Sequence, residues 1–184
     1  MQPLAAIGLA WLCWVISWAL AAMWVNRTVA KPAGGGELRS RLTVGAGAAL
    51  LFWGFHDAPG YTGLAGWSLF AVVVLGFLFA WWARLHLGRL WSGRVTRKEG
   101  HHVVNTGPYA LVRHPIYTGV IVSALAAGIA ERRWLALLGA IVIAIGFWLR
   151  ARLEERFLTG ELGPAYEAYA RQVPMLIPFF PRTR

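Results

Sequence analysis

The chain has 184 residues, of which 58% are hydrophobic and only 14% are charged. Soluble domains carry about 25% charged residues, so this chain cannot be exposed to water over its whole surface. The net charge of +10 does not indicate nucleic-acid binding, because the basic residues stand at the ends of apolar blocks rather than along one soluble face. A single cysteine, Cys13, excludes an intrachain disulfide.

Five apolar blocks predict an all-α integral membrane protein. The first block is long enough to cross a bilayer and no basic residue precedes it, so we interpret it as a retained helix rather than a signal peptide. The second block and the last two are shorter than the roughly 20 residues of a full crossing, and the last two are expected to form a short helical hairpin. The expected helices cover residues 4–25, 42–55, 63–83, 115–130 and 134–149.

The polar segments between these blocks predict the orientation. With the amino terminus outside, segments 26–41, 84–114 and 150–184 are cytoplasmic and contain 16 of the 18 Lys and Arg residues. The positive-inside rule therefore predicts an N-out, C-in protein. The apolar residues at the start of segment 84–114, from Leu85 to Trp91, suggest that this part lies along the membrane surface.

A first cluster of chemically active residues surrounds Arg113-His114-Pro115. Pro115 is suited to the first position of a helix, whose free N–H groups and positive dipole end favour an anion. His114 and Tyr117 are three residues apart, so at a helix start they can point toward one site. Taken alone, Arg113 and His114 are better explained as interfacial anchors, as basic residues at span ends commonly are.

A second cluster, Arg150 to Arg156, follows the last apolar block. On a helix, Arg152, Glu155 and Arg156 share one face, whereas Arg150 and Glu154 pair on the other. Charges this close to hydrocarbon are costly unless they are paired or face a polar cavity, so they are functional candidates. The alternative is a salt-bridged helix end that stops the span.

A third stretch mixes aromatic residues with prolines, at 162–169 and again at 173–180. It is compatible with a surface lid and with an apolar pocket for a flat ring. The adjacent His101 and His102 have no companion ligands nearby in the sequence, so a wet loop is a better interpretation than a metal site.

Together the three clusters resemble the isoprenylcysteine carboxyl methyltransferase family of small integral membrane methyltransferases. The resemblance covers roughly residues 100–181 and includes the order and spacing of the motifs, which makes it more specific than any single piece. The matching patterns are G-x-Y-x-x-x-R-H-P-x-Y-x-G at 107–119, R-x-E-E at 152–155, G-x-x-Y-x-x-Y at 163–169 and V-P-x-x-x-P-F at 173–179.

This resemblance implies an enzyme that uses S-adenosylmethionine, bound at the cytoplasmic face beneath the carboxyl-terminal segment, and releases S-adenosylhomocysteine. The acceptor would be a prenylcysteine-like carboxylate or another lipophilic molecule that enters from the bilayer. The implied cofactor-binding residues are Tyr109, His114, Tyr117, Glu155, Pro178 and Phe179.

The resemblance also implies that Arg152 and Glu155 are catalytic and face the reacting group. An arginine can orient a carboxylate acceptor bidentately, and a glutamate can accept a proton from an amine acceptor. The whole chain, residues 1–184, is expected to form a single membrane domain. Within it, 1–85 would be an amino-terminal three-helix part and 86–184 the methyltransferase-like, cofactor-binding part.

The expected location is a bacterial or archaeal cell membrane, with membrane lipid as the surroundings and neither a nucleic acid nor an obligatory protein partner. An NADPH-dependent membrane reductase of the sterol reductase type is the alternative enzyme, because those reductases have a similar R-H-P-x-Y-like block. Their R-D-E with a following Cys and Lys-Tyr-Gly is missing from this sequence. A transporter or scaffold is disfavoured because the expected spans contain almost no charge.

Overall fold

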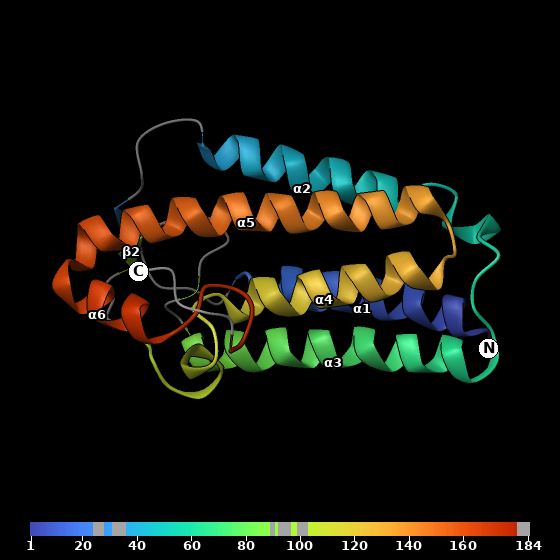
Figure 1. The fold of residues 1–184 in the computed structure, drawn as a ribbon, viewed down its shortest axis with the longest axis horizontal. Helices are drawn as coiled ribbons and strands as arrows, with labels where there is room; N and C mark the ends of the chain where they lie inside the picture. Colours follow the sequence, from blue (N-terminus) through green and yellow to red (C-terminus); the bar gives the residue numbers. More distant parts are fainter. Residues whose placement is uncertain (24–27, 31–35, 89–90, 92–96, 99–102, 180–184) are drawn as a thin grey trace.

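The computed structural model describes residues 1–23, 28–30, 36–88, 91, 97–98 and 103–179. Five long helices of the described part run along the long axis of the molecule, and α6 lies at the opposite end from the start of α1 (Figure 1). The long helices are α1 (Pro3–Ala21), α2 (Gly36–Phe52), α3 (Gly63–Leu87), α4 (Pro115–Ala130) and α5 (Trp134–Leu162). The shorter elements are β1 (Thr28–Ala30), η1 (Phe55–Asp57), β2 (Arg97–Lys98), η3 (Gly107–Ala110) and α6 (Pro164–Gln172), with β1 and β2 paired antiparallel.

Prolines and glycines define several helix ends. Pro3, Pro115 and Pro164 occupy the first positions of α1, α4 and α6, where the missing N–H is not needed. Gly88 and Gly163 follow α3 and α5 with positive φ angles of 57° and 55°, a conformation that other residues adopt only with strain. The predicted start of a helix at Pro115 is confirmed.

Helices α1, α3 and α5 are long and apolar enough to cross a membrane, with mean hydropathies of 2.0, 2.2 and 2.0 in their most apolar stretches. The prediction that the last two helices form a short hairpin was wrong for α5. This helix has 29 residues and continues through the charged residues from Arg150 onward. The apolar stretch ends near residue 149. Arg, Leu and Glu are good helix formers, so the helix itself does not end there.

Two other boundaries differ from the predictions. Helix α2 begins at Gly36, six residues before the apolar block, so its first two turns lie in a segment expected to be a loop. Helix α3 continues to Leu87, which places Leu85 and Leu87 in its last turn rather than in a separate surface segment. Both ends are polar extensions of apolar helices, and hydropathy alone does not detect them.

Small residues allow close helix packing in two places. Helix α2 packs against α5, and α3 packs against α4, which in turn lies beside α5 (Figure 1). A Cβ added at Gly47 would lie 2.8 Å from the carbonyl oxygen of Gly139, and one added at Gly76 would lie 2.6 Å from that of Gly119. Such contacts stabilise helix pairs in lipid, where there is no hydrophobic driving force between them.

Arg84 joins the ends of α1 and α3. Its buried guanidinium donates hydrogen bonds to the carbonyl oxygens of Gly88 (2.6 Å) and Ala21 (2.8 Å). It also lies over the ring of Trp91, 4.5 Å from the ring centroid. A cation at two helix carboxyl termini is favourable because both carry partial negative charge. Arg84 thereby holds Trp91 against the bundle.

Candidate functional site

The candidate site lies at the start of α4, where the chain that follows α6 crosses this helix end (Figure 1). The backbone N–H groups of Arg113 and His114 donate to the carbonyl oxygens of Pro174 (2.9 Å) and Met175 (3.1 Å). The Thr118 hydroxyl donates to the carbonyl oxygen of Leu176 at 2.7 Å. These contacts bring the first and third sequence clusters together, although about sixty residues separate them.

Arg113 and Glu155 form the first half of an ionic cluster. The Arg113 Nε donates to Glu155 Oε1 at 2.6 Å, and its Nη1 donates to the carbonyl oxygens of Ala170 (2.7 Å) and Val173 (2.6 Å). The Nε2 of His114 lies 3.3 Å from the same glutamate oxygen. With side-chain exposures of 12% and 19%, Arg113 and Glu155 form a charge-assisted pair that solvent screens only partly.

Tyr117 organises the second half of the cluster. Its hydroxyl donates to Glu154 Oε2 at 2.6 Å and accepts a hydrogen bond from Arg150 Nε at 3.0 Å. Its ring stacks on the His114 imidazole with centroids 5.3 Å apart and planes 3° from parallel. The hydroxyl therefore links Arg150 and Glu154, and the ring fixes the orientation of His114.

Three of the predicted site residues meet in this cluster: His114, Tyr117 and Glu155. Tyr109 is buried nearby, where its carbonyl oxygen accepts a 2.7 Å hydrogen bond from the Tyr169 hydroxyl. Burial, together with the Glu154 carboxylate, raises the pKa of the Tyr109 phenol well above its usual value. Tyr109 thus stays neutral, and its predicted role in cofactor binding remains a prediction.

The other predicted residues lie at the surface or its edge. Arg152 is exposed, and its guanidinium lies over the ring of Trp148, 5.5 Å from the centroid. Pro178 is half-buried, whereas Phe179 is 94% exposed with a φ of 62°. The structure does not bring these three side chains into the His114 cluster, so their roles also remain predictions.

Sequence reasoning named Arg150 and Glu154 only as general functional candidates, and it assigned no specific role to them or to Arg113. Arg113 and Glu154 belong to two of the motifs and Arg150 stands just before the second of these, but their partners cannot be read from the local pattern. Arg150 and Tyr117 are 33 positions apart, and Arg113 and Glu155 are 42 apart. Within the described residues no group of His, Cys, Asp or Glu side chains is arranged to hold a metal ion. His101 and His102 lie outside the described residues.

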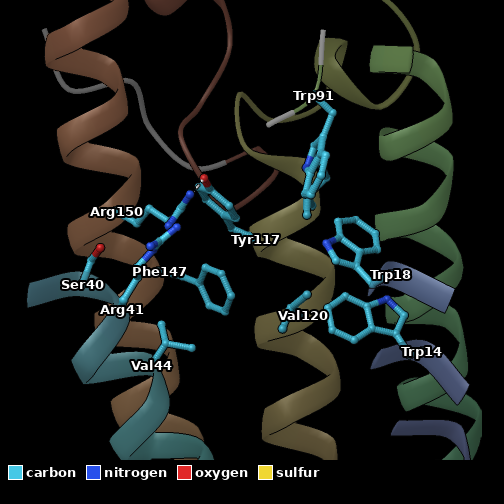
Figure 2. Close-up of a pocket in the computed structure, with 11 residues that line it drawn as sticks. Trp14, Trp18, Ser40, Arg41, Val44, Trp91, Tyr117, Val120, Phe147 and Arg150 are labelled. Carbon is cyan, nitrogen blue, oxygen red and sulfur yellow. Dashed lines mark hydrogen bonds between the residues drawn. The ribbon is translucent and has the colours of Figure 1, made fainter. Parts of the chain in front are cut away.

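A cavity of about 260 Å³ lies beside the cluster (Figure 2). Tyr117 belongs to both, since it lines the cavity and also stacks on His114. Arg41 and Arg150 approach Tyr117 at one end, and the remaining walls are mostly aromatic and aliphatic (Figure 2). The lining residues are Trp14, Trp18, Ser40, Arg41, Val44, Trp91, Ile116, Tyr117, Val120, Phe147 and Arg150.

The helices and the partly buried ionic cluster define an integral membrane helical protein with a polar site at one end of its bundle. Residues 67–160 match the family described as isoprenylcysteine carboxyl methyltransferase (ICMT). The chain belongs to this family. The matched stretch begins within α3, well before residue 100, and includes His114, Tyr117 and Glu155. The proline-containing tail lies beyond it.

Curated relatives support the family assignment. The chain is 36% identical over 86 residues to the protein-S-isoprenylcysteine O-methyltransferase of Schizosaccharomyces pombe, covering 46% of this chain and 36% of that protein. It is 32% identical over 152 residues to methanethiol S-methyltransferase 2 of Bradyrhizobium diazoefficiens, covering 73% and 57%. It is also 34% identical over 99 residues to the cobalt-zinc-cadmium resistance protein CzcN of Cupriavidus metallidurans, covering 52% and 44%. The chain thus spans about half the length of the curated relatives it matches.

Proposed function

We propose that this chain is a membrane methyltransferase that transfers a methyl group from S-adenosylmethionine to a lipophilic acceptor at the cytoplasmic face. One observation carries the proposal: Arg113, His114 and Tyr117 meet Glu154 and Glu155 in a cluster beneath the tail, within the residues that match the family. A helix end with ordinary surface ion pairs would not need this partly buried convergence of two helices and a tail.

The residues of the cluster fit the chemical groups of the cofactor. S-adenosylmethionine supplies the methyl group on a positively charged sulfur and also carries an ammonium, a carboxylate and an adenine. The carboxylates of Glu154 and Glu155 suit its cationic groups, and Arg113 suits its carboxylate. As the resemblance implies, Pro178 and Phe179 would wall the adenine. The donor set is therefore compatible with binding.

The contribution of the protein is mainly positioning. Displacement at a methyl carbon requires aligned reactants more than proton transfer. His114 and Tyr117 are held in stacked rings, and Glu155 is fixed by Arg113, so the site is preorganised. We retain the predicted catalytic roles of Arg152 and Glu155 toward the acceptor as part of the proposal.

We further propose an N-out, C-in orientation in a bacterial or archaeal cell membrane. The excess of basic residues in the segments that include Arg39, Arg41 and Arg84 supports it. The acceptor would reach the site from the bilayer. The named relatives act on prenylated cysteine and on methanethiol, and both acceptors are consistent with a site that excludes water.

Calorimetric titration of the detergent-purified protein with S-adenosylhomocysteine and, separately, with NADPH tests the proposal. We expect S-adenosylhomocysteine to bind and NADPH to give no heat of binding. Binding of NADPH without binding of S-adenosylhomocysteine would overturn the proposal in favour of the reductase.

A further inference from the structure

The cavity beside the cluster takes much of its wall from helices outside the stretch that matches the family. Trp14 and Trp18 come from α1, and Ser40, Arg41 and Val44 come from α2, whereas the match begins at residue 67. The family-matched part supplies the rest, including Tyr117 and Phe147. The amino-terminal half of the chain therefore shapes the space next to the ionic cluster.

The two ends of this cavity differ in chemistry. Figure 2 shows the guanidinium groups of Arg41 and Arg150 converging near Tyr117, whereas Trp14 and Trp18 lie across the cavity from them. Arg41 pairs with Glu37 at 3.1 Å, and Arg150 donates to the Tyr117 hydroxyl. Among the described residues that line the cavity, two are cationic and none is acidic. Glu37 and Glu154 lie next to these arginines but are not part of the cavity lining, so the cavity itself presents guanidinium groups at this end, which favour an anionic ligand head.

We propose that this cavity binds the methyl acceptor and that Arg41, on α2, is a specificity-determining residue that selects an acceptor with an anionic head. The inference rests on the proposed function. The head would be a carboxylate or a thiolate, held between Arg41 and Arg150, with an apolar chain against the tryptophans. An amine head would face the two guanidinium groups and bind less tightly than an anionic head.

The position of the cavity fits this role. Tyr117 forms a wall that the cavity shares with the proposed cofactor site. On the side of the proposed cofactor site its ring stacks on His114. Within the cavity its ring is tilted against that of Phe147, and these two ring centroids are 5.1 Å apart. An acceptor head beside Tyr117 would thus lie next to the proposed methyl donor. The volume of about 260 Å³ falls just below the roughly 300–1,000 Å³ of pockets for drug-sized ligands, which suits a short apolar chain.

Calorimetry in detergent with octanoate, octanethiol and octylamine tests the inference, because these ligands share a chain and differ in their heads. We expect octanoate to bind wild-type protein at least 10-fold more tightly than octylamine. Arg41→Met should weaken octanoate binding by roughly 10- to 100-fold, the loss of one hydrogen bond to a charged group. Arg41→Lys should restore part of the affinity. The octanethiol arm distinguishes a thiolate acceptor from a carboxylate acceptor.

Arg39→Met is the matched control, because Arg39 is exposed on the same helix and does not line the cavity. It should leave octanoate binding unchanged. Equal loss in Arg39→Met and Arg41→Met, or octylamine binding as tightly as octanoate in the wild type, would overturn the inference. Titration of each sample with S-adenosylhomocysteine separates the two proposals. If the wild type does not bind S-adenosylhomocysteine, the methyltransferase proposal is refuted. If the wild type binds it but octanoate binding is unselective, only the role of Arg41 is refuted.

Discussion

The two ends of the α4–α5 pair treat acidic side chains in opposite ways. At one end Glu155 contacts Arg113 and His114, and Glu154 accepts a hydrogen bond from Tyr117. At the other end Glu131, directly after α4, is completely buried, and among the described residues neither of its carboxyl oxygens has a hydrogen-bond partner. Glutamate side chains are thus paired at the candidate site, whereas the glutamate at the turn between α4 and α5 is isolated.

The isolated acid has a measurable consequence. Burial raises the pKa of Glu131 to about 7, although Arg133 partly opposes this shift. Arg133 instead donates hydrogen bonds to the carbonyl oxygens of Trp53 (2.7 Å) and Gly54 (2.6 Å). Burial alone thus favours a neutral acid, whereas a charged acid persists only where cations and donors surround it.

Glu155→Gln should produce the largest effect. It removes the charge that Arg113 and His114 share, so we expect affinity for S-adenosylhomocysteine to fall by roughly 10- to 100-fold. Calorimetry measures the change. Glu167→Gln is the matched control, because Glu167 is an exposed partner of Arg171 on α6 and should leave the affinity unchanged. Similar behaviour of the two variants would contradict the assignment of Glu155 to the cofactor site.

Tyr117→Phe should have an intermediate effect. The ring stays in place, but the hydroxyl that links Glu154 and Arg150 is lost. We expect methyl transfer to octanoate or octanethiol to slow by about 5- to 10-fold, as expected from a loss of about 1 kcal/mol. Radiolabelled methyl transfer measures the rate, and the unfolding temperature serves as a control for folding. An unchanged rate would show that the link is structural only.

Glu131→Gln should have the smallest effect, and that effect should depend on pH. Between pH 4.5 and about 7 the folded chain retains a proton at Glu131 that the unfolded chain has released, so the contribution of Glu131 to stability decreases as pH rises through this window. The variant should therefore match the wild type at pH 4.5 and exceed its Tm at pH 8 by about 2–4 °C, the shift that 1 kcal/mol gives in a chain of this size. Thermal unfolding at both pH values is the measurement, and an identical Tm at pH 8 would contradict the isolated burial of Glu131.

Sequence reasoning predicted the parts of the molecule that depend on local composition. Apolar blocks revealed the five helices, and Pro115 marked the start of α4. The motifs also pointed to His114, Tyr117 and Glu155, which the structure brings together. The helices and their ends are encoded by neighbouring residues, whereas the site residues were indicated by the family resemblance.

The features that the sequence missed depend on polar helix extensions and distant partners. The length of α5 was missed because the charges after residue 149 end the hydropathy signal without ending the helix. Arg41 was assigned to a loop, but the extension of α2 toward Gly36 makes it a cavity-lining helical residue. The link between Arg150 and Glu154 through the Tyr117 hydroxyl requires two helices to be placed side by side, which no local pattern specifies.

The tail that crosses the start of α4 also affects when the site can form during synthesis. Arg113 and His114 donate their backbone N–H groups to carbonyl oxygens of residues 174 and 175, and Thr118 reaches Leu176. The helical bundle can assemble early, but the site closes only after residue 176 has left the ribosome. If the chain binds S-adenosylhomocysteine as we propose, that binding would then report that this segment has been synthesised and has docked.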